Sequence, residues 1–140
     1  MPTLLRPLAV ALLLGAALAP QTASATPTEA DEPKVLALLF AADWCGSCKI
    51  LDPKLTAARA GLADEPVQFV TLDHTDADAR AAAAATAREG GYADLYAEYA
   101  GKTGFVLLVD AESFEVIDRI TKDDSEVHIR QKVRRALATA

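Results

Sequence analysis

The strongest constraint on the fold is an unbroken apolar segment, residues 35–40, which two cysteines follow closely. A strand made only of apolar residues is expected to be buried on both faces, as in the centre of a sheet with helices on both sides. Beyond the cysteines, Leu51, Leu55, Ala58 and Leu62 recur at spacings of three and four, which places them on one face of a helix. A buried strand leading directly into a helix predicts an α/β fold.

The rest of the chain predicts three more strands and further helices. The expected strands are residues 67–72, 105–109 and 115–120, and the last two form a hairpin around a short acidic turn. Helical patterns lie between residues 75 and 100 and from about residue 125 onward, and Thr75 with Asp78 fits a capping box for the first of these. The order βαβαββα predicts one domain with a mixed sheet between helices.

The N-terminus resembles a secretory leader. Arg6 is the only charged residue before Glu29, residues 8–19 are apolar, and residues 23–25 (Ala-Ser-Ala) form the small-x-small pattern that signal peptidases cleave. The alternative is a membrane anchor, but this apolar run is shorter than the roughly 20 residues that span a bilayer. We therefore expect a signal peptide over residues 1–25.

The predicted mature chain has a disordered lead-in at residues 26–34 and a folded domain at residues 35–140. The composition of the full sequence, 51% hydrophobic and 24% charged, is that of an ordinary globular protein. Loss of the leader changes the formal net charge from −6 to −7. An acidic chain gains nothing from counterion release on nucleic acid and is not attracted to anionic lipid, so we expect neither partner.

The two cysteines stand where the first helix begins and are spaced to share one helical face. Positions i and i+3 lie within one turn, close enough for a disulfide. Cys45 falls at the helix N-terminus, where free N–H groups and the dipole stabilise an anion. Thiols in such places have pKa values of roughly 3.5–7.5 instead of about 8.5. Cys45 is therefore the expected nucleophile, and Cys48, predicted to be more buried, the resolving thiol.

Three other roles for the pair stay open: a structural staple, a metal site and inert thiols. A disulfide that closes so short a loop restricts the unfolded chain by only about 2 kcal/mol. Zinc takes three or four protein ligands, and the chain adds only His74 and His128 to the two thiols. Redox exchange is the interpretation we favour, with no metal and no cofactor. We interpret His74 as a solvated loop residue, with proton shuttling as the alternative.

The segment from Phe40 to Lys49, which contains Trp-Cys-Gly-Ser-Cys-Lys and is followed by Pro53, resembles the active-site region of the thioredoxin family. The resemblance extends more loosely to residue 137 through the order of the elements. It implies the thioredoxin-like fold, with a four-stranded mixed sheet of order 2-1-3-4 flanked by helices. The family's nucleophile, resolving cysteine and ring-packing tryptophan correspond to Cys45, Cys48 and Trp44. The remaining positions that the resemblance assigns to the site are Gly46, Ser47, Lys49 and Pro53 as support, and Thr103 and Gly104 for substrate binding.

Several positions depart from the family pattern. The strand and helix that usually precede this region are missing, and the stretch between the second and third strands is longer. The buried acid expected six residues before the first cysteine is Leu39, and the lysine expected near it is Thr71. The resolving step then depends on water or on His74. The family's cis-proline opposite the cysteines is Gly104, so we expect a trans peptide there and a position that would accept proline.

The resemblance implies a thiol–disulfide oxidoreductase that exchanges electrons between Cys45/Cys48 and disulfides of proteins or small molecules. With the leader, it implies a periplasmic protein. The expected partners are disulfide- or thiol-containing proteins and an unidentified redox partner; we expect a monomer, with no membrane insertion after cleavage. The alternatives are a non-catalytic binding module of the same fold and a redox-dependent metal or cluster carrier. The sequence does not set the direction of electron flow, which depends on how far each thiolate is stabilised.

Export by a bacterial host should yield a soluble product that begins at Thr26, because residues 23–25 form the best cleavage pattern in the chain. Intact-mass measurement of the exported protein checks this. A product that keeps Met1 and stays with the membrane would contradict the cleavage site and favour an anchor.

Overall fold

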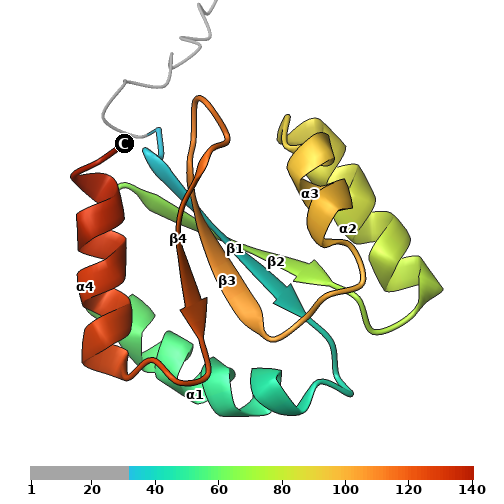
Figure 1. The fold of residues 1–140 in the computed structure, drawn as a ribbon, viewed down its shortest axis with the longest axis horizontal. Helices are drawn as coiled ribbons and strands as arrows, with labels where there is room; N and C mark the ends of the chain where they lie inside the picture. The colour runs from blue at the N-terminus through green and yellow to red at the C-terminus, as the bar shows by residue number, and fades with distance from the viewer. Residues whose placement is uncertain (1–31) are drawn as a thin grey trace, which may run out of the picture.

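The computed structural model describes residues 32–140; the expected signal peptide and most of the expected lead-in lie outside the described residues. Eight elements follow one another along the chain (Figure 1). They are β1 (Val35–Ala41), α1 (Gly46–Ala60), β2 (Val67–Asp73), α2 (Ala77–Glu89), α3 (Ala93–Tyr99), β3 (Phe105–Asp110), β4 (Val116–Thr121) and α4 (Glu126–Leu137). The long segment between β2 and β3 therefore forms two helices.

The four strands form one mixed sheet in the order β2-β1-β3-β4, as the family resemblance implies. β1 pairs in parallel with β2 and antiparallel with β3, and β3 pairs antiparallel with β4. Lys34, at the end of the expected lead-in, already belongs to this structure, because its N–H donates to the Pro66 carbonyl and its carbonyl accepts from Ala111. The central pair, β1 and β3, is covered on both faces.

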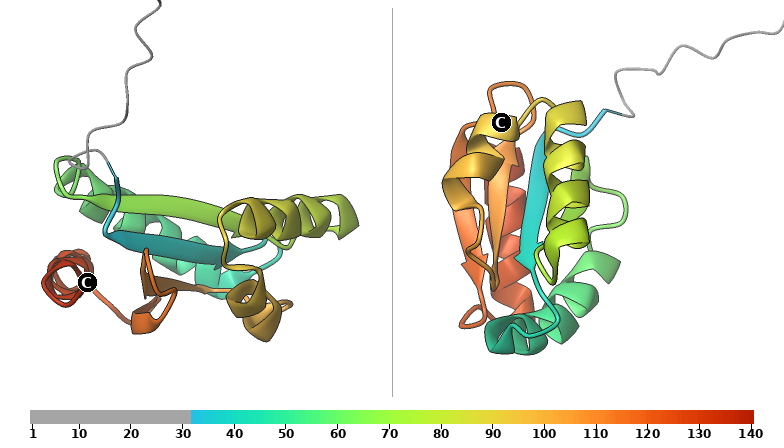
Figure 2. Two further views of the ribbon diagram at one scale, coloured as in Figure 1. Left: turned by 90° about the horizontal axis from the view of Figure 1, so that it is seen from above. Right: turned by 90° about the vertical axis from the view of Figure 1, so that its right-hand side faces the viewer.

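The residues of β1 and β3 alternate between two separate hydrophobic cores, one on each face of the sheet. Val35, Ala37, Val106 and Leu108 pack on one face of the sheet against α1 and α4. Their neighbours in sequence point to the other face, where α2 and α3 cover them (Figure 2). Residues that share this second core are Leu36, Leu38, Phe40, Leu72, Ala83, Ala87, Tyr92, Tyr96, Phe105, Leu107 and Val109. Burial on both faces explains why β1 has no polar residue.

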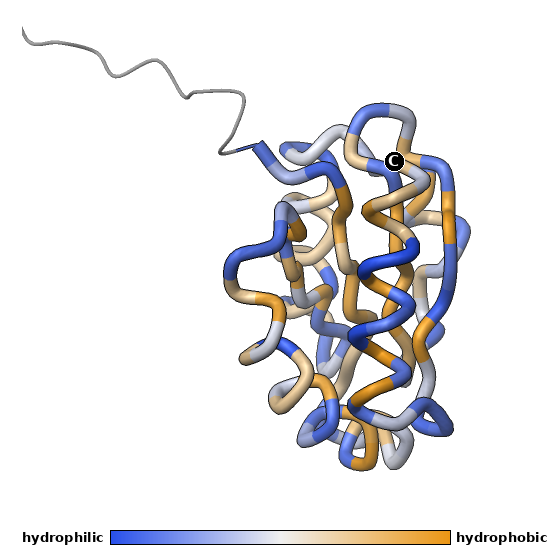
Figure 3. Tube along the Cα trace, turned by 90° about the vertical axis from the view of Figure 1, so that its left-hand side faces the viewer, coloured by the Kyte–Doolittle hydropathy of each residue, from blue (hydrophilic) through white to orange (hydrophobic). Residues whose placement is uncertain are grey.

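Helix α4 shows how the surface is kept polar. Its buried residues Ile129, Val133 and Ala136 face the sheet, and hydrophilic turns alternate with them along the outer side (Figure 3). Ser125 caps the helix by accepting the N–H of His128 at 3.2 Å.

No helix within residues 32–140 is long and apolar enough to cross a membrane.

Four connections meet at one end of the sheet. The parallel strands β1 and β2 both end there, antiparallel β3 begins there, and β4 ends there (Figure 1). The β1–α1, β2–α2, α3–β3 and β4–α4 connections therefore share this end. In open α/β sheets ligands gather at the carboxyl ends of the strands, so this end is the expected position of a functional site.

Candidate active site

Cys45 and Cys48 form a disulfide at the start of α1, with their Cα atoms 5.3 Å apart. Cys45 occupies the N-cap position, with extended backbone angles, and Cys48 lies in the first turn. The sequence Gly-Ser between them lets the helix begin at once, so that both sulfurs stand at its N-terminal end. The pair therefore lies where the sequence predicts, beside the ends of β1 and β2.

The surroundings of the two sulfurs differ in a way that favours Cys45 as the thiolate. The N–H of Cys48 donates to the sulfur of Cys45 at 3.1 Å. The sulfur of Cys48 instead lies 4.0 Å from the carbonyl oxygen of Phe40, which repels an anion. No acidic residue stands in the first turn of α1. A donor at one sulfur and an acceptor at the other stabilise negative charge at Cys45 when the pair is reduced.

Burial does not distinguish the two cysteines as the sequence predicted. Cys45 is 6% exposed and Cys48 is 9% exposed, so the expectation that Cys48 is the more buried residue is wrong. The reason is that the connection before β3 covers Cys45, where an ideal Cβ on Gly104 would lie 3.4 Å from the sulfur. The chemical asymmetry of the pair therefore rests on hydrogen bonding.

Trp44 lies on the surface next to the disulfide and is 62% exposed. Its indole N–H donates to the Thr75 carbonyl at 3.1 Å, and the preceding N–H, of Asp43, donates to the Thr75 hydroxyl at 3.0 Å. The hydroxyl of Thr75 in turn donates to Asp73 at 2.6 Å. These contacts tie the β1–α1 connection to the β2–α2 connection. Sequence reasoning missed this role of Thr75 and assigned the residue to a capping box.

Helix α2 is in fact capped by Asp76, which accepts the N–H of Ala79 at 2.8 Å. The hydroxyl of Thr75 is therefore not needed as a helix cap and accepts the N–H of Asp43 instead. Hydrogen bonds from the Thr75 hydroxyl and N–H hold the pKa of Asp73 below its usual value. Asp73 is thus an ionised anchor for this connection and a weak proton acceptor.

The other residues that the resemblance assigns to the site differ in their exposure and in how close they lie to the disulfide. Gly46 and Lys49 are exposed, and a Cβ on Gly46 would meet nothing within 4 Å. Pro53 lies inside α1 and is exposed. Ser47 is half-buried and faces Gly104. A Cβ added to Gly104 would lie only 2.7 Å from the Cβ of Ser47. Ser47 and Gly104 therefore meet beside the disulfide.

Gly104 lies where the resemblance places the family's proline, but its backbone differs. No peptide bond in residues 32–140 is cis, so the Thr103–Gly104 bond is trans, as the sequence predicts. The φ angle of Gly104 is +94°, and its N–H donates to the Phe40 carbonyl at 2.8 Å. Proline is restricted to negative φ and has no N–H to donate. The expectation that this position would accept proline is therefore wrong.

A cavity of about 330 Å³ opens beside Cys48. Leu39 and Thr71, which replace the family's acid and lysine, line it together with Cys48. The residues that complete its lining are Ala41, Ala42, Asp43, Lys49, Asp52 and Asp73. His74 is not among them, so of the two routes that we expected for the resolving proton this cavity favours water.

His74 is buried, which corrects our interpretation of it as a solvated loop residue. It is 1% exposed and packs against the rings of Phe40 and Tyr96, at centroid distances of 5.8 and 5.5 Å. Its Nδ1 accepts the N–H of Gly101 at 3.4 Å, and its Nε2 has no partner among the described residues. Burial, assisted by the charge of Arg80 and opposed by Asp73, lowers the pKa of His74.

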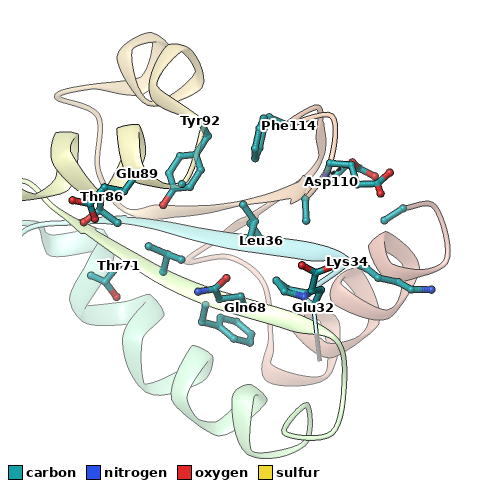
Figure 4. Close-up of a pocket in the computed structure, with 17 residues that line it drawn as sticks. Glu32, Lys34, Leu36, Gln68, Thr71, Thr86, Glu89, Tyr92, Asp110 and Phe114 are labelled. Atoms are coloured by element: carbon teal, nitrogen blue, oxygen red, sulfur yellow. Dashed lines mark hydrogen bonds between the residues drawn. The ribbon is translucent and has the colours of Figure 1, made fainter. Parts of the chain in front are cut away.

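Two further observations concern ligands. Within residues 32–140 no group of three or more His, Cys, Asp and Glu side chains is arranged to hold a metal ion. A larger cavity, of about 1000 Å³, is lined by Leu36, Tyr92 and Phe114 among others (Figure 4). Neither cysteine lines it, so it is not part of the disulfide site.

Comparison with known proteins agrees with this geometry. A sequence model of the thioredoxin family matches residues 23–88. Over 43 residues the chain is 46% identical to Thioredoxin H8 of Arabidopsis thaliana, a match that covers 31% of this chain and 28% of that protein. The chain thus spans less than a third of the curated relative it matches.

Solved structures share the fold. A thiol:disulfide interchange protein of the thioredoxin family from Chlorobium tepidum TLS superimposes with a TM-score of 0.52 at 20% identity, covering 74% of this chain and 80% of that one. The MTB dsbF protein gives a TM-score of 0.50 at 19% identity, covering 77% and 84%. These structures show that the chain has the thioredoxin fold, and the sequence match to the thioredoxin family covers the segment that contains Cys45 and Cys48.

Replacing Gly104 with alanine should destabilise the fold more than the same change at Gly101. Both glycines have positive φ, which costs alanine about 1–3 kcal/mol, but only at Gly104 would the new Cβ also collide, with Ser47. Urea unfolding of the two variants measures the difference. Adding Ser47→Gly to Gly104→Ala should recover it, and equal losses in both single variants would contradict the close approach.

Replacing Leu39 with aspartate should accelerate the resolving step and lower the free energy of unfolding by about 1–3 kcal/mol at neutral pH. The new carboxyl would stand beside Cys48 as a base. Partial burial raises its pKa above about 3.9, so the loss of stability should grow as pH rises through that range. Leu39→Asn is the control, since it adds polarity without a base. Stopped-flow decay of a mixed disulfide measures the step, and equal rates in Leu39→Asp and Leu39→Asn would refute the role of the base.

Proposed function

We propose that this protein is a thiol–disulfide oxidoreductase that exchanges electrons between Cys45/Cys48 and the disulfides of proteins or small molecules. The observation that carries the proposal is the asymmetric pair at the N-terminus of α1, with an N–H donor 3.1 Å from the sulfur of Cys45 and a carbonyl oxygen near that of Cys48. A structural staple needs no such asymmetry. The Chlorobium tepidum protein that shares the fold is a thiol:disulfide interchange protein, which supports the same reaction class.

The reaction follows two exchange steps. In the reduced protein the Cys45 thiolate attacks one sulfur of a substrate disulfide, forms a mixed disulfide and releases the other substrate sulfur as a thiolate. Cys48 loses its proton and attacks Cys45, which re-forms the Cys45–Cys48 disulfide and releases the second substrate thiolate. Two electrons pass from the pair to the substrate, and each released thiolate takes up a proton. The same steps in reverse oxidise a substrate dithiol.

The setting that we propose for this reaction is the bacterial periplasm, reached through cleavage of the leader after Ala25. The leader pattern in the sequence supports it, and a compartment that permits disulfides suits a dithiol exchanger. The proposed partners are disulfide- or thiol-containing proteins and a separate redox protein that recharges the pair, and the protein acts as a monomer.

Single cysteine variants test the roles of the two sulfurs. Cys45→Ser should abolish exchange, whereas Cys48→Ser should keep an attacking thiol and accumulate mixed disulfides, because only Cys45 receives the stabilising N–H. Alkylation of the reduced protein at acidic pH, followed by peptide mass analysis, should label Cys45 first. Preferential labelling of Cys48 would reverse the assignment.

Insulin reduction by the wild-type protein separates the oxidoreductase from a non-catalytic binding module. The oxidoreductase turns over with an added dithiol, while a binding module leaves insulin intact. Metal analysis of anaerobically purified protein tests the third alternative, since a metal or cluster carrier would retain bound metal in stoichiometric amount.

A further inference from the structure

Two connections flank the disulfide: one holds the neighbouring Trp44, and the other lies against Cys45. The β2–α2 connection holds Trp44 through the Thr75 carbonyl. The α3–β3 connection brings Gly104 against Ser47 and Cys45 and is held at its end by the hydrogen bond from Gly104 to Phe40. Helices α2 and α3 separate the two connections in sequence, so something must fix them relative to each other.

His74 lies between them and is bonded to both sides. Its backbone N–H donates to the Ala41 carbonyl at 2.8 Å, which continues the β1–β2 pairing by one residue. Its ring accepts the N–H of Gly101 at 3.4 Å, near the beginning of the α3–β3 connection. Its carbonyl oxygen accepts from Arg80 of α2 at 3.4 Å. One buried residue therefore joins β1, α2 and the chain that leads to Gly104.

The hydrogen bond to Gly101 requires a neutral ring with its proton on Nε2. Nδ1 accepts, so it must be unprotonated, and the Nε2–H then has no partner among the described residues. A second proton on Nδ1 would make it a donor that faces another donor. An unpartnered buried donor lowers stability, so a histidine that serves only to fill the core would be a poor choice here.

The groups that face the ring mostly oppose its protonation. Arg80 of α2 is positively charged, Phe40 of β1 is apolar, and the hydroxyl of Tyr96 in α3 donates to the Arg80 carbonyl. Asp73 of β2 is the one acid that favours the charged ring. Lys102, next to Gly101, adds a positive charge and lies over Tyr99. Because burial lowers the pKa of His74 below its usual 6.5, its contribution to stability is complete above that pH and is lost as pH falls below it.

We propose that His74 is a positioning residue that holds the α3–β3 connection in place beside the disulfide, and that it does so only while its ring is neutral. This inference rests on the proposed function and adds to it a determinant of substrate class. Gly104 lies against Ser47 and Cys45, so on the proposed function a protein disulfide approaches Cys45 along the backbone at Thr103 and Gly104. A small disulfide reaches the sulfur without that edge. Protonation of His74 should therefore weaken reaction with proteins and spare reaction with small molecules.

The experiment compares two substrates in the same protein. Reduced wild-type protein is mixed with insulin or with oxidised glutathione in stopped flow between pH 4.5 and 8 (a range of about two units below and above the usual histidine pKa). The ratio of the two rate constants cancels the titration of Cys45. We expect the rate constant for insulin divided by that for glutathione to fall about threefold to tenfold toward acidic pH. This change corresponds to the loss of one hydrogen bond.

Three variants test whether the pH dependence of this ratio comes from His74. His74→Asn keeps an acceptor for Gly101 but cannot titrate, so its ratio should stay near the neutral wild-type value at every pH. His74→Phe fills the space without an acceptor, so its ratio should be low at every pH. His128→Asn removes the exposed histidine of α4 and should behave as wild type.

A wild-type ratio that does not change with pH, or the same pH profile in wild type and His74→Asn, would overturn the proposal. If His74→Phe fails to fold, the comparison of wild type with His74→Asn still decides. The amide resonance of Gly101 provides a readout besides activity: it should titrate with the His74 ring in wild type and not in His74→Asn. Absence of exchange with both disulfides would overturn the proposed function and the effect on substrate class, while the Gly101 resonance would still show whether His74 holds the connection.

Discussion

The backbone of Phe40 connects the core of the sheet to the chemistry of the disulfide. Its carbonyl oxygen accepts the N–H of Gly104 at 2.8 Å and lies 4.0 Å from the sulfur of Cys48. Pairing of Phe40 with β2 and β3 fixes the direction of that carbonyl, and the Phe40 side chain is fully buried and stacks on Phe105 at 5.1 Å. A change in how β1 ends would therefore alter both the substrate edge and the surroundings of the resolving thiol.

Most contacts that shape the site come from backbone groups. The carbonyl of Thr75 holds Trp44, the N–H of Cys48 faces the sulfur of Cys45, and the N–H of Gly104 holds its own connection to β1. Backbone groups are placed by the strands and helices that contain them, so the geometry of the site depends on the sheet register. This explains why a residue such as Gly46, whose added Cβ would meet nothing, contributes little by its side chain.

Local pattern was enough to predict the strands, the first helix and the position of the cysteines, while the sheet order came from the family resemblance. The apolar run of β1 and the period of α1 each arise from neighbours in sequence, which is what a pattern records. His74 could not be placed in this way. Its burial depends on Tyr96 and Gly101, which follow only after the whole of α2, and these pack on it because the segment after β2 folds back as two helices. The burial of Cys45 was missed for the same reason, because the connection that contains Gly104 and covers Cys45 is distant in sequence.

The one signal in the sequence that could have pointed to His74 is its position directly after a strand whose end lies beside the cysteines. What the sequence does not show is the cost of placing it there. A buried imidazole with an unpartnered Nε2–H destabilises the fold by about 1–3 kcal/mol relative to a satisfied group. A phenylalanine would fill similar space without that cost but would leave the N–H of Gly101 without its acceptor. The balance favours histidine only if the connection that leads to Gly104 must be held, and the role that we propose for this connection beside the disulfide supplies that need.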